Sequence, residues 1–295
     1  MERSSLNIFA LTTAVTTFFL LIAGSLVTTT GSGLAVPDWP LSFGQFFPQM
    51  KGGVFFEHGH RVIAGIVLIL SAILSGWLWK SKGKSKVSIL STLALGLVLI
   101  QALLGGITVL YGLPPAISTL HATLAQTFFC LMVSIALFTS PIWKNNGSAQ
   151  FLFSPRVRKK FFLGLRTYPL ISVSVFILLF IQLILGASFR HGLGMRPLYG
   201  HIGNGFLVAL LGGVLSLYIV KEFRGNKILF RAGLFFLALL LAQMVLGLTA
   251  VSPLFGVSLF PANVRIVILT SHIGLGALLL AASLVITLLQ YKANE

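Results

Sequence analysis

The sequence has few charged residues and almost no acidic ones. Of its 295 residues, 56% are hydrophobic and only 9% are charged, and the mean hydropathy is +0.98. Soluble domains carry a more balanced mixture of apolar and charged residues. The composition therefore excludes a soluble domain and indicates an integral membrane protein.

Cysteine is nearly absent. Cys130 is the single cysteine, and it lies inside an apolar run. One cysteine excludes an intrachain disulfide and also a cysteine-based metal cluster or zinc site.

Basic residues outnumber acidic ones by 21 to 5, giving a net charge of +16. Such a charge would indicate nucleic-acid binding if the basic residues formed one face. Instead they cluster in short tracts between long apolar runs, where anionic lipid headgroups and membrane orientation explain them. We therefore expect membrane lipid as a partner and no nucleic acid.

Eight apolar segments are long enough to cross a bilayer, which takes about 20 helical residues for roughly 30 Å of hydrocarbon. Lipid satisfies no backbone polar group, so the segments should be helices, since barrel strands would alternate in polarity. The first segment follows Arg3 and ends in a signal-like Ala-Gly-Ser, but it is long enough to span, and we expect it to be retained. The segments lie near residues 8–28, 60–79, 87–110, 117–139, 168–188, 199–220, 229–251 and 264–290.

The basic tracts predict the orientation. They occupy the N-terminal tail, the connections after the second, fourth and sixth spans, and the C-terminal tail. Under the positive-inside rule both termini are cytoplasmic. The opposite side holds only Lys51, Arg61, Arg190, Arg196 and Arg265.

The two halves of the chain look like copies. Gln-x-x-x-Gly begins at both Gln101 and Gln243, and the histidine pairs His60/His201 and His121/His272 are 141 and 151 residues apart. Because each copy has an even number of spans, the copies should be parallel repeats. The predicted fold is an all-α integral membrane protein with two four-helix bundles: an N-terminal half (1–140), a cytoplasmic connection (141–167) and a C-terminal half (168–295).

The four repeated histidines are the strongest functional signal. Ionisable residues inside spans are expensive and indicate function. A lone histidine would most simply form an interhelical hydrogen bond, but two pairs at similar depth are how helix bundles hold a haem iron through its axial positions. A zinc hydrolase is the weaker alternative, because catalytic zinc usually takes three protein ligands and each half offers two histidines. The metal-ligand candidates are His60, His121, His201 and His272.

Small and amide side chains accompany the histidines. Glycine would let a flat ring approach the backbone, although membrane helices also use glycine for ordinary packing. The glycines near the histidines are Gly59, Gly200, Gly203, Gly205 and Gly274. Each of Gln101, Gln182 and Gln243 lies four residues before a glycine, and we interpret all three as interhelical hydrogen-bond donors.

Glu57 makes the halves chemically unequal. It shares a helical face with His60 and Arg61, whereas Leu198 stands at the matching position of the second half. One site should therefore do chemistry, with Glu57 as its catalytic residue, while the other serves electron transfer or structure. The alternative is a simple Glu57–Arg61 ion pair at the helix start. His58 should point about 200° away from His60, toward the headgroups.

Two features of the predicted outer side each have two possible interpretations. Arg61, Arg190, Arg196 and Arg265 are candidates to bind haem propionates, but snorkelling to headgroups would explain them equally well. The connection from Gly31 to Phe56 is rich in aromatic residues and has no equally long counterpart in the second half, so it is either an interfacial anchor or a lid over a site. His191 receives no role.

Taken together, these residues resemble the haem A synthase family. The resemblance rests on GSGLAVPDWPL, on Glu57, His60 and Arg61, and on the segments around Gln101, His121, His201 and His272, so it covers all eight spans. It implies oxidation of the C8 methyl of haem O to the formyl of haem A for terminal oxidases. Haem O would bind near Glu57, His60 and His121, and a haem b between His201 and His272.

The resemblance also implies a bacterial cytoplasmic membrane location with haem sites near the outer face. Haem O synthase and cytochrome oxidase assembly factors become candidate partners, and self-association is left open. Many bacterial members carry a cysteine pair in the first outer loop, where this chain has Leu34, Ala35, Leu41 and Ser42. Any mechanism that needs that pair is excluded. Two alternatives remain: a dihaem electron-transfer cytochrome, and a transporter built from parallel repeats.

Overall fold

The computed structural model describes residues 2–144, 167–225, 227–257 and 259–292, and the fold within these ranges is helical. Within these ranges, eight helices are long and apolar enough to span a membrane, so the chain is a multi-pass membrane protein. The predicted connection at 141–167 falls largely outside the described residues. The long helices are α1 (Glu2–Thr29), α2 (Gly53–Lys82), α3 (Lys86–Leu110), α4 (Pro115–Thr139), α8 (Thr167–Arg190), α9 (Arg196–Glu222), α10 (Lys227–Val251) and α11 (Ala262–Lys292).

The second helix starts earlier than the hydropathy predicts. It begins at Gly53, about two turns before the expected position 60. The backbone can remain helical beyond the apolar run, and Gly52, with φ of 56°, forms the turn that ends the preceding loop. Glu57, His58 and His60 consequently lie within the helix, where their directions are determined by the helical repeat.

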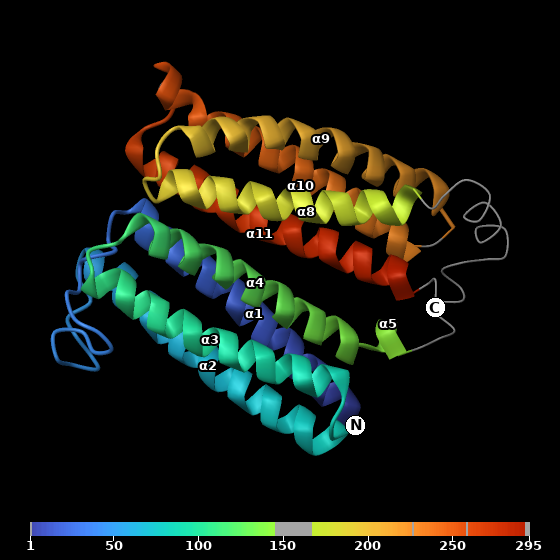
Figure 1. Cartoon of the computed structure of the whole chain (residues 1–295), viewed down its shortest axis with the longest axis horizontal. Helices are drawn as coiled ribbons and strands as arrows, with labels where there is room; N and C mark the ends of the chain where they lie inside the picture. The colour runs from blue at the N-terminus through green and yellow to red at the C-terminus, as the bar shows by residue number, and fades with distance from the viewer. Residues whose placement is uncertain (1, 145–166, 226, 258, 293–295) are drawn as a thin grey trace.

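The long helices form two groups (Figure 1). In the N-terminal group, α1 packs on α2, α2 on α3, α3 on α4 and α4 back on α1; α8 to α11 close a ring in the same order. In each ring, the helices that carry the histidines stand at opposite corners: α2 and α4, then α9 and α11. That the groups are parallel repeats stays a prediction.

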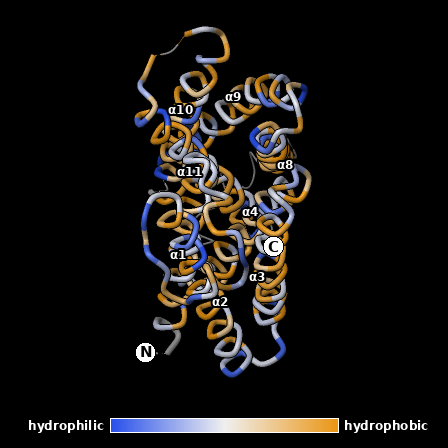
Figure 2. The backbone as a smooth tube through the Cα atoms, turned by 90° about the vertical axis from the view of Figure 1, so that its left-hand side faces the viewer, coloured by the Kyte–Doolittle hydropathy of each residue, from blue (hydrophilic) through white to orange (hydrophobic). Residues whose placement is uncertain are grey.

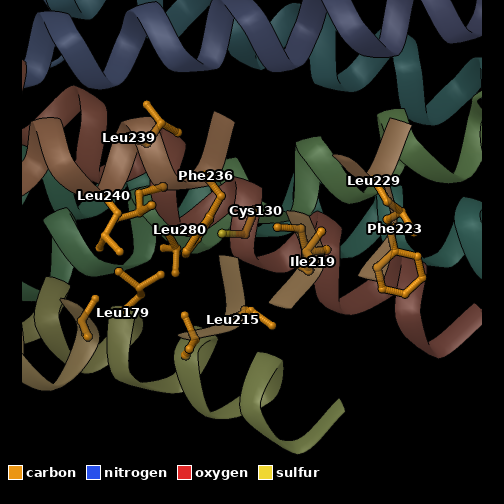
Figure 3. Close-up of a cluster of buried hydrophobic side chains, with 14 residues drawn as sticks. Cys130, Leu179, Leu215, Ile219, Phe223, Leu229, Phe236, Leu239, Leu240 and Leu280 are labelled. Atoms are coloured by element: carbon orange, nitrogen blue, oxygen red, sulfur yellow. The ribbon is translucent and has the colours of Figure 1, made fainter. Parts of the chain in front are cut away.

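Each group has its own apolar core. Val67, Leu74 and Met132 are among the buried residues of the N-terminal group. The C-terminal core, drawn in Figure 3, includes Leu215 and Phe236 and also takes in Cys130 from α4. Both cores lie away from the histidine ends of the helices. Along each histidine-bearing helix, the first buried core residue comes seven residues after the histidine, at Val67 in α2, Phe128 in α4, Val208 in α9 and Leu279 in α11.

The groups meet through α1 and α4 on one side and α8 and α11 on the other. Leu21, Phe129 and Ala277 are buried at this seam. Gly274 permits a close crossing, because a Cβ there would lie 2.5 Å from Ile22 Cδ1. This glycine therefore serves helix packing, which was one of its two predicted roles.

Many large apolar side chains are exposed on the helices. Figure 2 shows that hydrophobic residues predominate along the helical backbone. Such a surface on a membrane protein faces acyl chains. The connections α1–α2, α3–α4, α8–α9 and α10–α11, the last containing η1 (Ser252–Phe255), all lie at one end of the molecule (Figure 1). The short helix α5 (Pro141–Lys144) lies at the other end.

Candidate functional site

His201 and His272 face each other across the C-terminal group. Their ring centroids are 6.1 Å apart, and the ring planes are inclined by 73°. A metal–imidazole bond is about 2 Å long and the ring centre lies about 1 Å beyond the nitrogen, so two axial imidazoles put their ring centres about 6 Å apart. The spacing therefore fits a haem iron between the rings, although an aromatic pair can also adopt it.

His60 and His121 occupy the corresponding corners of the N-terminal group. Both rings are half-buried, and they lie within electrostatic range of each other. The structure thus brings the C-terminal pair of histidines face to face and places the N-terminal pair on the corresponding helices of its group.

A glycine on the neighbouring helix lets each imidazole approach its backbone. A Cβ on Gly186 would lie 2.9 Å from His201 Cε1, and one on Gly247 would lie 3.1 Å from His272 Cε1. The corresponding distances are 3.0 Å from Gly24 to His60 and 3.4 Å from Gly105 to His121.

These glycines differ from those expected. Gly59 and Gly203, which neighbour histidines in the sequence, have open space where a Cβ would stand. The glycines that touch the rings come instead from the preceding helix, because it is that helix which crosses the histidine at close range.

One nitrogen of each imidazole faces a backbone carbonyl. His201 Nδ1 lies 3.0 Å from the Gln182 carbonyl oxygen. The imidazoles of the other three histidines lie near the carbonyls of Leu20, Gln101 and Gln243, and their buried Nδ1 atoms have no hydrogen-bond partner among the described residues. Nε2 has no hydrogen-bond partner among the described residues. Metal-binding histidines commonly have this arrangement, because a carbonyl partner orients the second nitrogen toward the metal.

Glu57 is buried, and both of its carboxylate oxygens accept hydrogen bonds. It is 3% exposed; Oε1 accepts a hydrogen bond from Arg61 Nη2 at 2.6 Å, and Oε2 accepts one from the Val36 N–H at 2.8 Å. The ion pair considered as the alternative is therefore present. It does not exclude chemistry, because it holds the carboxylate at a defined position one helical turn before His60.

Arg61 also ties the loop between α1 and α2 to α2. Its Nη1 donates to the carbonyls of Asp38 and Leu41, both at 2.7 Å. Beside it, the Ser42 hydroxyl lies 2.8 Å from His58 Nδ1. The expectation that His58 points to the headgroups is wrong: the side chain is only 8% exposed, because the loop folds back over it.

The loop has an ordered turn and an inward-facing tryptophan. Hydrogen bonds from the backbone N–H groups of Gly44 and Phe43 lower the pKa of Asp38, and they hold Phe43 at φ 54°. Trp39 packs so closely on α3 that a Cβ on Gly106 would lie 2.6 Å from its ring. Phe47, at the tip, is 92% exposed. The loop thus packs on α3 through Trp39 and exposes an aromatic tip, while its role as an interfacial anchor or as a lid over a site stays a prediction.

The other candidate arginines differ in their surroundings. Arg190 Nη2 donates to the Ser25 carbonyl at 3.0 Å and to Thr29 Oγ1 at 2.8 Å, which places this guanidinium at the seam between the groups. Arg196 and Arg265 are exposed. Burial lowers the pKa of the neighbouring His191 to about 4, with smaller contributions from Arg190 and His121.

Two of the three glutamines act as predicted. The side-chain amides of Gln182 and Gln243 each donate to a histidine carbonyl at 2.8 Å. Gln101 is buried, and neither of its amide atoms has a partner. Among the described residues, no three histidine, cysteine or acidic side chains are grouped to hold a metal ion, as a zinc site would require.

Sequence comparison agrees with this architecture. The COX15-CtaA model, described as "Cytochrome oxidase assembly protein", matches residues 7–196, more than half of the chain. The "Heme A synthase" of Geobacillus kaustophilus is 26% identical over 271 residues, covering 84% of this chain and 82% of that protein. The "Heme A synthase" of Alkalihalophilus pseudofirmus is 26% identical over 83% of this chain and 87% of its own length.

A third relative matches this chain over a shorter region. The "Heme A synthase" of Bacillus pumilus is 33% identical over 138 residues, which cover 46% of this chain and 45% of that protein. Together with the family match and the eight membrane helices, these similarities bear out the resemblance seen in the sequence. The chain belongs to the COX15-CtaA family of cytochrome oxidase assembly proteins.

Proposed function

We propose that this chain is a haem A synthase, which oxidises the C8 methyl group of haem O to the formyl group of haem A for terminal oxidases. Its family membership and the names of its relatives support this function. The geometric observation that carries it is the 6.1 Å separation of the His201 and His272 rings, which suits axial ligation of a haem iron.

We assign the C-terminal pair, His201 and His272, to a resident haem b. The N-terminal pair, His60 and His121, then takes haem O as the substrate. Two observations support this division: the opposed rings of the C-terminal pair, and the presence of Glu57 only in the N-terminal group. The buried apolar cores stop short of all four histidines, so they do not fill the space between the paired rings.

Glu57 is the proposed catalytic residue. Conversion of a methyl group to an aldehyde passes through an alcohol in two rounds. Written with water as the oxygen source, the first round gives the alcohol and the second the aldehyde, and each round releases two protons and passes two electrons to an external oxidant. A carboxylate beside the reacting carbon can accept the protons or stabilise positive charge. Arg61 and the Val36 N–H would keep this carboxylate aimed in one direction. Haem b, when bound, would supply electron transfer.

The arginine at the seam is the best-supported propionate contact. Arg190 is half-buried, and its hydrogen bonds to α1 use Nη2, which leaves its other nitrogens for a carboxylate. Arg61 already donates to Glu57 and to the loop, so its contribution to propionate binding would be indirect. The exposed Arg196 and Arg265 would reach a propionate only at the protein surface.

The proposed setting is the bacterial cytoplasmic membrane, with both termini cytoplasmic and the haem sites near the outer face. The distribution of basic residues supports this orientation. A site open to lipid would suit haem O, whose farnesyl tail is apolar. Haem O synthase and oxidase assembly factors are the proposed partners.

Pigment analysis tests the proposal. The protein would be purified from cells that also express haem O synthase, and its extracted haems would be separated by chromatography. A synthase should yield haem b together with haem O and haem A, whereas a dihaem cytochrome would yield haem b alone.

Glu57→Gln tests the assigned role of the carboxylate. The amide keeps the size of the side chain but lacks the charge, so haem b and haem O should still be bound while haem A fails to form. Haem A at the wild-type level in this variant would refute the role of Glu57.

A further inference from the structure

The four histidines share one local arrangement. Each ring lies against a glycine of the preceding helix, and the residue four positions before that glycine presents its carbonyl to the ring. The carbonyl and glycine residues are Leu20 and Gly24 for His60, Gln101 and Gly105 for His121, Gln182 and Gly186 for His201, and Gln243 and Gly247 for His272.

In the C-terminal group, a glutamine side chain closes the arrangement. Gln182 Nε2 donates to the His201 carbonyl and Gln243 Nε2 donates to the His272 carbonyl, each at 2.8 Å. Asn204 supports the first of these bonds by donating to Gln182 Oε1 at 2.7 Å. Each histidine is therefore held twice: its ring faces the carbonyl of the glutamine, and its own carbonyl accepts from the amide of the same glutamine. We call this second bond the brace.

The brace needs a glycine one turn after the histidine. A Cβ on Gly205 would lie 3.1 Å from Gln182 Nε2, and one on Gly276 would lie 3.0 Å from Gln243 Nε2. Both distances are tighter than most contacts of a real Cβ atom, so a side chain at either position would require the amide to shift by a few tenths of an ångström. We expect that shift to weaken the bond to the histidine carbonyl.

The N-terminal group lacks the brace at both histidines. Leu20 has no donor, and the residue one turn after His60 is Ala64. Gln101 has the donor, but Ala125 stands one turn after His121, where the C-terminal group has glycine. The side-chain amide of Gln101 has no hydrogen-bond partner among the described residues, although the residue is only 7% exposed. By analogy with Gly205 and Gly276, we infer that the Ala125 methyl group occupies the space that the Gln101 amide would need to reach the His121 carbonyl.

We propose that Gln182 and Gln243 are positioning residues that brace the histidines of the resident haem, and that the missing brace at His60 and His121 leaves the other site able to exchange its haem. This inference rests on the proposed function. A resident cofactor must be held through many turnovers, whereas haem O must enter and haem A must leave. Hydrogen bonds behind metal ligands commonly change metal affinity by about 10- to 100-fold.

Leucine substitutions test the brace, because they copy Leu20. In purified protein that carries its haems, Gln182→Leu and Gln243→Leu should each release haem b to apomyoglobin about 10- to 100-fold faster than wild type. They should also shift the haem b midpoint potential and its low-spin electron paramagnetic resonance signal. Gln101→Leu is the matched control: it removes a buried glutamine at the same helical position and should leave haem b release unchanged.

Glycine and alanine exchanges test the same bond without removing the amide. Gly205→Ala and Gly276→Ala should loosen haem b as the leucine variants do, although alanine favours the helix. These variants keep the experiment decisive if a leucine variant fails to fold. Conversely, Ala125→Gly gives Gln101 room to reach the His121 carbonyl and should slow the release of haem A from the N-terminal site.

The outcomes separate the two proposals. Haem b release at the wild-type rate in all four brace variants, or equal loosening by Gln101→Leu, would overturn the brace. A wild-type protein that binds haem b but never yields haem A would refute the synthase function and leave the brace standing. A wild-type protein without haem b would overturn both.

Discussion

Replacing Gly186 with alanine should displace the His201 ring. The added Cβ would lie 2.9 Å from Cε1 and 3.0 Å from Nδ1 of His201, whereas carbon atoms in contact prefer about 3.5–4.0 Å. The ring must therefore move by more than half an ångström. Overpacking of this kind costs about 1–3 kcal/mol. If that cost falls on the haem-bound state, haem b affinity should drop by about 5- to 150-fold.

The assay is the haem b content and the haem b release rate of purified Gly186→Ala. Gly213→Ala is the matched control, because it lies in the histidine-bearing helix α9 but meets no atom within 4 Å. Alanine stabilises a helix relative to glycine by about 1 kcal/mol, so the control should keep its haem and its thermal stability. Full haem b retention in Gly186→Ala would refute the assignment of His201 as a ligand held against this glycine.

Three further predictions concern the outer side. Arg61→Leu leaves Glu57 buried without its cation, so the protein should lose about 3 kcal/mol of stability. The loop between α1 and α2 should also be cut faster by protease in spheroplasts, and an unchanged cleavage rate would contradict the role of Arg61 in holding this loop. Gly106→Ala should push Trp39 away from α3 at a cost of about 1–3 kcal/mol, visible as a lower melting temperature, whereas an unchanged one would argue against this contact. The pKa of His191 is lowered to about 4, so between pH 4 and 6.5 the unfolded state binds more protons than the folded state. The stability of the protein should therefore fall as the pH is lowered from 6.5 to 4. His191→Gln should weaken that fall, which thermal unfolding at several pH values would measure.

The helices and the histidine pairs were predictable from the sequence. Lipid allows little besides apolar helices, and the repeated register of His60, His121, His201 and His272 reports a shared role. The Glu57–Arg61 pair also followed from the helical period.

The contacts between distant segments were not predictable. The Val36 N–H that binds Glu57, the serine that binds His58 and the glycines that touch the rings all depend on which helix or loop crosses another. Hydropathy carries no information about such crossings. The start of α2 was misjudged for a related reason, since a helix can continue past the end of an apolar run.

Electron cryo-microscopy of the purified, haem-loaded protein tests the central claim most directly. We expect density for a porphyrin between α9 and α11, with Nε2 of both His201 and His272 about 2 Å from its iron, and a second porphyrin beside His60, His121 and Glu57. Density for a haem bound elsewhere, or histidine rings that contact only protein and lipid, would contradict it.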